Sequence, residues 1–237
     1  MEFEVWGFAL EVGKHLITAI FSIFMIQPDL KLILTKIKIM KYYLIFGLFA
    51  FSFTGLAQDM KPEILSPEIQ IKTAVLAAPE ELRSEAKVYG YDKTGKMVVL
   101  REGNNHMICL ADDPAKKGIS VSCYNDKLEP FMARGRELSI EGKSEMDKRA
   151  ARQQEVEAGT LKMPDAPSMT YIFTGNDENY NKTTGELKDG KFRYVIYIPF
   201  ATTETTGLPD KPEAPGMPWL MDPGTHRAHI MISPVSN

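Results

Sequence analysis

Apolar residues between positions 64 and 82 recur at the spacing of an α-helix, so a short helix is predicted near the start of the folded region. Ser66 supplies an N-cap hydroxyl and Pro67 suits the first helical position. Pro79 lacks a backbone N–H and is expected to divide the stretch into two short pieces. The apolar face of this helix consists of Ile64, Ile71, Val75, Ala78 and Leu82.

The apolar period then changes to two, which is typical of β-strands. This alternation predicts four strands, over residues 87–91, 96–101, 106–110 and 119–124. Gly95 lies in the turn between the first two strands, because glycine readily adopts the left-handed conformation that a hairpin turn needs. An antiparallel meander of the four strands would place Cys109 and Cys123 on neighbouring strands.

Helical spacing returns after residue 126 and predicts a second helix. Its apolar face is formed by Leu128, Phe131, Met132 and Leu138. Residues 141–157 are dense in charge of both signs and predict a surface helix, which an i,i+4 pair of Glu145 and Arg149 supports. Mixed charge of this kind is typical of a solvated helix face rather than of a nucleic-acid-binding patch.

Three further strands are expected over residues 169–174, 192–200 and 228–233. Two polar loops, 175–190 and 202–224, separate them, and the second contains five prolines, which disfavour a helix or a central strand. Neither an internal repeat nor a βαβ alternation is visible. The pattern therefore predicts an α+β fold, a single domain over residues 58–237 with a mainly antiparallel sheet and two or three helices.

A signal peptide is predicted inside the chain, over residues 40–57. Lys36, Lys38 and Lys41 form a positive cluster around Met40, the apolar run 42–53 follows, and small residues precede a cleavage site after Ala57. The run is too short for a comfortable membrane span. Residues 1–39 then represent either an over-extended gene start, with Met40 as the true start, or a real N-terminal extension.

Composition narrows the class of protein and its partners. The chain has 237 residues, 44% of them apolar and 25% charged, with a formal net charge of −3, which excludes a disordered tail, a collagen-like fibre and a multi-span membrane protein. Beyond Ala57, 23 Lys and Arg face 27 Asp and Glu, so no basic excess favours a nucleic-acid backbone. We expect a periplasmic or secreted protein with no nucleic-acid partner and no stable membrane span after cleavage.

Cys109 and Cys123 are expected to form a disulfide, because an exported protein meets an oxidising compartment. The bond closes a loop of 13 intervening residues, which contributes about 3 kcal/mol on the loop-entropy model. The alternative is a pair of buried free thiols. Two cysteines are too few for a four-cysteine zinc site, and their spacing differs from that of a Cys-x-x-Cys redox pair.

His226 and His229 have the spacing of a metal-binding pair on a helix, where positions i and i+3 share a face. The surrounding residues instead predict a loop followed by a strand, in which the two side chains point to opposite sides. Zinc needs three or four convergent ligands, which Asp222 and His106 would have to complete through folding. The alternative is a histidine hydrogen-bonded at the end of a strand, and no cofactor is expected.

Other motifs fall short of a recognisable site. Gly142, Lys143 and Ser144 resemble the end of a P-loop, but Glu137 stands where that motif requires glycine. The acidic loop around Asp177 lacks the EF-hand spacing of calcium sites. The Gly-x-Ser-x-Gly and His-Glu-x-x-His motifs of hydrolases are absent from the sequence.

Trp219 and Arg101 are the candidate binding residues. Trp219 lies in the proline-rich loop and serves either as an aromatic platform for a carbohydrate or peptide, or as an anchor that pins the loop to the core. Arg101 and Glu102, at a strand end, either face a cleft or form a surface ion pair. An unrecognised hydrolase would use His229 together with Arg101 or Glu102 as its catalytic residues.

Several short sequence motifs occur in an order that is similar to that of a known protein group. They are Leu100-Arg101-Glu102-Gly103-Asn104-Asn105, Cys109, Asp112-Asp113-Pro114, Cys123, Pro218-Trp219 and Ala228-His229. With them, the region from Ile69 to the C-terminus resembles a group of uncharacterised exported bacterial proteins, whose pattern includes a counterpart of His229 but none of His226. The resemblance implies export and a single domain, and it implies no activity.

The function predicted from the sequence is therefore broad. We expect an exported, non-catalytic protein that binds a small ligand or another surface component. The alternatives are the hydrolase that uses His229 and a metal-binding protein that uses His226 and His229.

Overall fold

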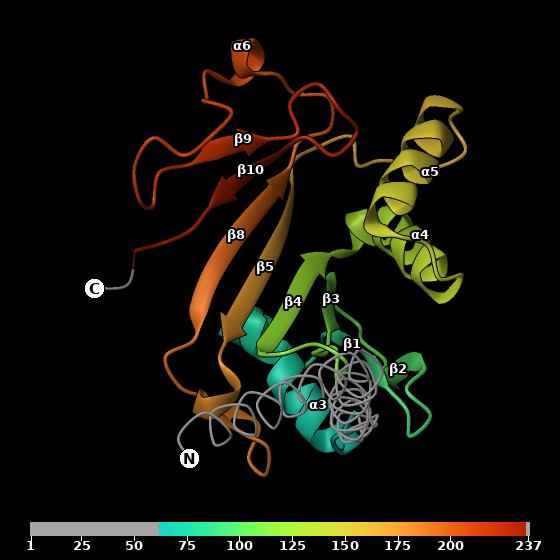
Figure 1. Cartoon of the computed structure of the whole chain (residues 1–237), viewed down its shortest axis with the longest axis vertical. Helices are drawn as coiled ribbons and strands as arrows, with labels where there is room; N and C mark the ends of the chain where they lie inside the picture. Colours follow the sequence, from blue (N-terminus) through green and yellow to red (C-terminus); the bar gives the residue numbers. More distant parts are fainter. Residues whose placement is uncertain (1–61, 236–237) are drawn as a thin grey trace, which may run out of the picture. The chain divides into compact units, whose positions relative to one another are not determined.

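The computed structural model describes residues 62–235 (Figure 1). The chain divides into two units between Met60 and Lys61, and the described residues belong to the second. The predicted signal peptide, the two alternatives for residues 1–39 and the domain start at residue 58 lie outside the described residues and stay predictions.

Three main helices and one single-turn helix are described. They are α3 (Pro67–Ala74), α4 (Glu129–Ile140), α5 (Glu145–Glu157) and the single turn α6 (Thr203–Thr206). Four 3-10 turns lie between the longer elements: η1 (Val75–Ala77), η2 (Glu80–Leu82), η3 (Asp126–Leu128) and η4 (Asp177–Asn179).

Eight strands form one sheet in the order β2-β1-β3-β4-β5-β8-β10-β9, and β6 pairs with β7 in a separate hairpin. The strands of the first half are β1 (Lys87–Tyr91), β2 (Met97–Arg101), β3 (Met107–Leu110), β4 (Ile119–Asn125) and β5 (Ser168–Gly175). Those of the second half are β6 (Tyr180–Asn181), β7 (Glu186–Leu187), β8 (Lys191–Tyr197), β9 (Trp219–Met221) and β10 (His229–Ile232). The α+β fold class is confirmed, with a mostly antiparallel sheet and three main helices.

The first four strands do not form the expected meander. β1 pairs antiparallel with β2 but parallel with β3, so β2 lies on one side of β1 and β3 lies on the other. The chain returns from β2 through residues 102–106 to reach the far side of β1. Alternation along a single strand cannot reveal such a parallel pairing, because it reports the buried face and not the neighbouring strand.

Local signals place α3 where the sequence predicts it. The Ser66 hydroxyl accepts a hydrogen bond from the backbone N–H of Ile69, and Pro67 opens the helix. Pro79 separates η1 from η2, as predicted. Gln70 on α3 joins the helix to the sheet, since its amide donates to the Tyr91 carbonyl (2.9 Å) and accepts from the Tyr91 N–H (2.7 Å).

The predicted disulfide between Cys109 and Cys123 is present. The two residues pair directly across β3 and β4, and both are fully buried. They lie in the core between α3 and the sheet, next to Ala74, Val88 and Val121. The bond therefore closes the loop 111–118 at its base.

The opposite face of the sheet carries the hairpin of α4 and α5. Tyr124, which follows Cys123 on β4 and so points to this face, is fully buried next to Leu128. Its hydroxyl donates to Glu129 (2.5 Å) and accepts from Arg136 (2.8 Å), and Arg136 also pairs with Glu129 (2.6 Å). These three residues join α4 to the centre of the sheet through a satisfied polar network.

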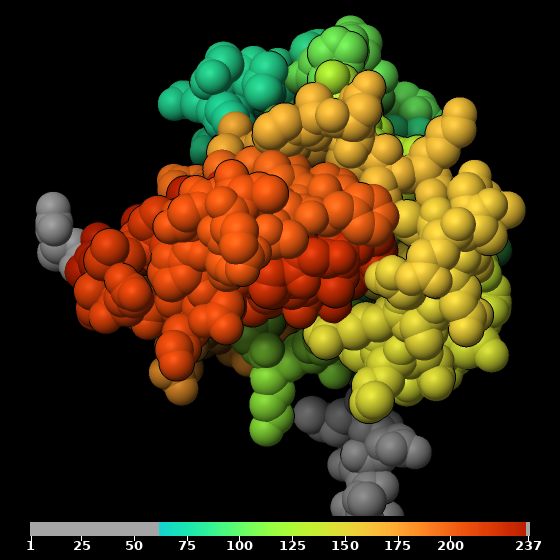
Figure 2. Space-filling view, turned by 90° about the horizontal axis from the view of Figure 1, so that it is seen from above, coloured from blue at the N-terminus to red at the C-terminus, as the bar shows by residue number. Residues whose placement is uncertain are grey.

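The helix predicted over 141–157 is α5, which begins at Glu145 after the N-cap Ser144. The expected pair of Glu145 with Arg149 is wrong: Glu145 forms an ion pair with Lys148 instead. Figure 2 shows the α5 segment (yellow) beside the C-terminal segment (red), where Gln153 contacts His226.

The two loops predicted as irregular contain short elements. The first includes β6 and β7, and the second includes α6 and β9. Despite its prolines, the second loop supplies an edge strand, because its Trp219–Met221 segment pairs with β10. Among residues 62–235, no helix combines the length and the apolar character that crossing a membrane requires.

Candidate functional site

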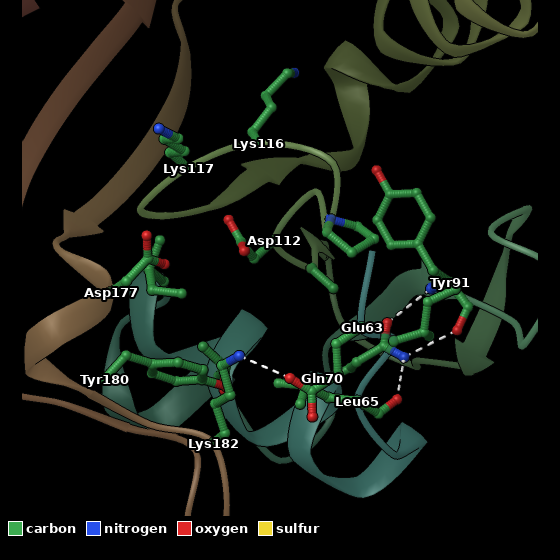
Figure 3. A pocket seen from close by; sticks show the side chains of 15 residues that line it. Glu63, Leu65, Gln70, Tyr91, Asp112, Lys116, Lys117, Asp177, Tyr180 and Lys182 are labelled. Atoms are coloured by element: carbon green, nitrogen blue, oxygen red, sulfur yellow. Dashed lines mark hydrogen bonds and ion pairs between the residues drawn. The ribbon is translucent and has the colours of Figure 1, made fainter. Parts of the chain in front are cut away.

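A cavity of about 250 Å³ lies between α3, the loop 111–118 and the β6–β7 hairpin, and is named here the Asp112 cavity (Figure 3). The residues of its wall that carry charge or a phenol are Glu63, Tyr91, Asp112, Lys116, Lys117, Asp177, Tyr180 and Lys182.

Backbone and side-chain hydrogen bonds hold the wall of the Asp112 cavity in place. Gln70 donates to the carbonyls of Leu65 (2.8 Å) and Tyr91, so it fixes two walls at once (Figure 3). The Ala111 N–H donates to the Tyr89 carbonyl (2.8 Å) and so extends the pairing of β3 beyond its last residue. The cavity is therefore pre-formed rather than dependent on a ligand for its shape.

Among the acids of this site, the Asp112 carboxyl has the pKa that departs most from its ordinary value. One of its oxygens accepts from the Ser120 N–H (2.8 Å). Partial burial raises the pKa of Asp112 to about 6, and the nearby carboxylates of Asp113 and Asp177 add to the shift. Asp177 itself accepts from the Gly118 N–H (2.9 Å), so these acids also hold the loop. A carboxyl that titrates near neutral pH inside a cavity is typical of a functional site.

Positive charge lies at the rim of the same cavity. Lys116 pairs with Asp113 (3.1 Å), whereas Lys117 forms no ion pair with any residue in the described part of the chain. Lys182 pairs with Glu63 (2.7 Å) on the other side of Asp112 (Figure 3). Figure 3 shows Lys116 and Lys117 on one side of Asp112, with their ammonium groups directed away from it, and residues of both signs of charge line the cavity.

Two phenols complete the wall. The Tyr180 hydroxyl is hydrogen-bonded to Thr73 on α3 (2.7 Å). Burial and the charges of Asp113 and Asp112 raise the pKa of Tyr91 to about 12, so its phenol stays protonated. A second hollow of about 680 Å³ shares Tyr91 and Asp112 with the first and extends to α4.

The sheet separates the residues of the predicted hydrolase. Arg101 lies at the end of the edge strand β2, and His229 lies on β10, with five strands between β2 and β10. At about 4.8 Å per strand, this order places the two residues roughly 29 Å apart. The structure therefore does not bring His229 together with Arg101 or with the adjacent Glu102.

Arg101 and its neighbours are engaged in holding the backbone. The Arg101 guanidinium donates to the carbonyls of Ala86 (3.0 Å) and Arg83 (2.5 Å). Glu102 pairs with Lys87 (3.1 Å) and not with Arg101. At Gly103, a Cβ atom would lie 2.3 Å from the Lys87 nitrogen, so only glycine fits. The Leu-Arg-Glu-Gly box thus fastens β2 to the start of β1.

His226 is buried between α5 and the C-terminal loop, with 2% of its surface exposed. Its Nδ1–H donates to the Gln153 amide oxygen, because Gln153 uses its own NH₂ on Glu157. Its Nε2 is buried without a hydrogen-bond partner among the described residues. Burial, followed by the charges of Arg152 and Arg227, lowers the pKa of His226 to about 4.

His229 lies on β10, packs against the ring of Tyr197 (5.1 Å between centroids) and donates from Nδ1 to the Arg227 carbonyl (2.6 Å). The predicted metal partners do not gather around it. Within residues 62–235, no group of three or more His, Cys, Asp or Glu side chains converges as a metal site would require. Asp222 pairs with Arg227 (3.1 Å), and His106 pairs with Asp126 (2.8 Å) beside the central strands β3 and β4, three strands away from β10.

Trp219 lies on the edge strand β9 and is partly exposed. It lines a hollow of about 520 Å³ together with residues of the proline-rich loop. This position, at the boundary between loop and sheet, is compatible with both predicted roles of Trp219, as a platform for a ligand and as an anchor of the loop.

The sequence did not single out Asp112, Tyr91, Tyr180 or Lys117 as site residues. Asp112 and Asp113 enter the sequence pattern only as part of a short motif, although an acidic pair soon after a buried strand is a usable signal. Tyr180 gives no such signal, because its place depends on the β6–β7 hairpin that reaches back to α3. The chain matches no protein-family model, no curated protein and no solved structure, so its function is argued from this geometry.

Proposed function

We propose that the domain is an exported binding protein that holds a small zwitterion, of the size of a free amino acid, in the Asp112 cavity without transforming it. The observation that carries this proposal is the Asp112 carboxyl, which faces a pre-formed cavity of about 250 Å³ with lysines at its rim.

The arrangement of charge favours a ligand with both signs. An ammonium group placed at Asp112 and Asp177 would restore the ionised form of Asp112, whose pKa burial now raises. A carboxylate on the same ligand would meet Lys117, whose ammonium forms no ion pair with a carboxylate of the described residues. Tyr91 and Tyr180 supply hydroxyl groups and flat apolar surface to the wall.

The wall supports binding rather than nucleophilic catalysis. Among the described residues that line the Asp112 cavity there is no serine, cysteine or histidine, the residue types that most often form covalent intermediates or move protons at neutral pH. Among the wall residues within 62–235, hydroxyl groups belong to Thr73, Tyr91 and Tyr180, and Thr73 is hydrogen-bonded to Tyr180.

Export is supported by the signal-peptide pattern over residues 40–57 and by the disulfide. Expression of the full chain in a bacterium with a working export pathway is expected to yield a mature protein that begins at Gln58. Its mass is expected to be about 2 Da below that of the dithiol form. An uncleaved, reduced chain found in the cytoplasm would contradict export.

The variant Asp112→Asn is expected to weaken binding and stabilise the free protein. The folded pKa of about 6 lies above the unfolded value of 3.8, so the ionised carboxyl opposes folding above pH 6 and ceases to do so below pH 4. With allowance for solvent screening, the variant should gain about 1 kcal/mol at pH 8 and none at pH 4. Chemical denaturation at the two pH values measures this difference.

Thermal-shift titration with each of the twenty amino acids tests the ligand class, with glucose and spermidine as probes of hydroxyl or amine groups alone. We expect certain amino acids to raise the melting temperature of the wild type by several degrees, and to lose this effect in Asp112→Asn. Asp210→Asn, at an exposed site in the proline-rich loop, is the matched control and should bind as the wild type does. Equal shifts in wild type and Asp112→Asn, or none with any amino acid, would refute the proposed ligand.

A further inference from the structure

A second group of chemically distinctive side chains lies on one face of the sheet at its C-terminal edge. On β10, His229 and Met231 are two residues apart, so their side chains leave the same face. The register pairs His229 with Met221 and Met231 with Trp219 on β9. Directly paired residues also share a face, so all four side chains stand together.

The spacing within this group is that of a compact ligand set. Met221 lies directly across from His229, with Cβ atoms about 5 Å apart, and diagonally from Met231, at about 7 Å. His229 and Met231 are separated by about 6.6 Å along β10. Met221 and Met231 line one hollow, and His229 is buried beside them on the same face.

The proline-rich loop brings a third methionine to the same place. Pro215 and Gly216 occupy the centre of a turn in which the Met217 N–H donates to the Ala214 carbonyl (3.2 Å), and Gly216 has a φ of 80°. Proline followed by a left-handed glycine is typical of a type II turn. Met217, Met221, Met231 and Trp219 then line one hollow of about 520 Å³.

His229 is prepared to act as a ligand. Its Nδ1–H donates to the Arg227 carbonyl, which fixes the tautomer and leaves the lone pair on Nε2. Histidines that bind metal ions usually hold their second nitrogen in this way. His226 does not line this hollow; its ring packs against Phe131 of α4, and its Nδ1 is bonded to Gln153 of α5.

We propose that Met221, Met231 and His229 bind a soft monovalent cation, Cu(I) or its analogue Ag(I), with Met217 at the mouth of the hollow and Trp219 beside the ion. Thioethers select Cu(I) among the biological metals because both are soft. The donor set is uncharged, and Arg193 lines the same hollow. Glu213 also lines the hollow and offsets the charge of Arg193, so the softness of the thioethers is what favours a monovalent ion.

Titration of the full, disulfide-bonded chain with Ag(I) in chloride-free buffer tests the site. Native mass spectrometry is expected to show one tightly bound silver ion on the wild type. In the double variant Met221→Leu, Met231→Leu the affinity should fall about tenfold or more, because leucine keeps the volume but removes the sulfur. The matched control Met132→Leu, Met169→Leu, which changes two methionines outside the hollow, should keep wild-type affinity.

A spectroscopic measurement keeps the proposal falsifiable if the double variant folds poorly. In wild type with carbon-13-labelled methionine methyl groups, the signals of Met221 and Met231 should shift on addition of Ag(I), and those of Met132 and Met169 should not. His226→Asn should bind as the wild type does, and Cu(I) held reduced under nitrogen should rank the variants in the same order. Unmoved Met221 and Met231 signals, or equal affinity of the double variant and its control, would overturn the site.

Discussion

Removal of the disulfide by Cys109→Ala, Cys123→Ala is expected to lower the free energy of unfolding by about 3 kcal/mol. The bond joins positions 14 apart, and it restricts the unfolded chain by closing that loop. For a domain of this size the loss corresponds to a fall of roughly 6–12 °C in melting temperature. Chemical denaturation of variant and wild type measures it directly.

The same change should weaken the binding of amino acids in the Asp112 cavity. The disulfide lies at the base of the loop that carries Asp112, Lys116 and Lys117, so its loss frees one wall of the cavity. Wild type unfolded and refolded under reducing conditions is the matched control, and should resemble the variant in stability. If the variant lost less than about 1 kcal/mol, the disulfide would not be the constraint assigned to it.

Acid is expected to destabilise the protein through His226. The folded pKa of about 4 lies below the unfolded value of 6.5, so the neutral ring favours folding. This contribution is complete above pH 6.5 and is lost as the pH falls toward 4, a change of about 3 kcal/mol. The physical reason is that a proton on Nε2 would be buried without an acceptor, near the positive charges of Arg152 and Arg227. The acids Asp222 and Glu157 oppose this effect but do not outweigh it.

The variant His226→Asn isolates this contribution, because asparagine can still donate to Gln153 but does not titrate. Its loss of packing against Phe131 lowers stability at every pH, so the informative quantity is the change between pH 7 and pH 4. That change should be about 3 kcal/mol smaller than in wild type. Asp112, whose shift has the opposite sign, is present in both proteins and cancels. His106→Gln, at an exposed histidine, should keep the wild-type change, and an equal change in His226→Asn would rule out His226 as the acid-sensitive group.

Features set by neighbours along the chain were predicted well. The Ser66 cap, the break at Pro79 and the turn at Gly95 appear where expected. The seven longer strands and the helices α4 and α5 agree with their predicted ranges to within a few residues. Periodicity, capping and turn chemistry act over a few residues, so they leave a clear pattern in the sequence.

Features set by contacts between distant segments were missed or wrongly assigned. The parallel pairing of β1 with β3 and the pairing of the Trp219 segment with β10 were not predicted. Glu145 forms its ion pair with Lys148 and not with Arg149. In each case several partners suit the local pattern equally well, and packing of the whole domain selects one of them.

The sequence by itself determined the α+β class, the main helices and strands, and the Cys109–Cys123 disulfide. Only the tertiary structure decided which side chains meet: Asp112 with Tyr180 and Lys117 in one cavity, and Met221 with His229 and Met231 on one sheet face. Local structure follows from hydrogen bonds and sterics within a few residues. A binding site depends on strand order and register, which are fixed only when the apolar faces of distant segments are buried together.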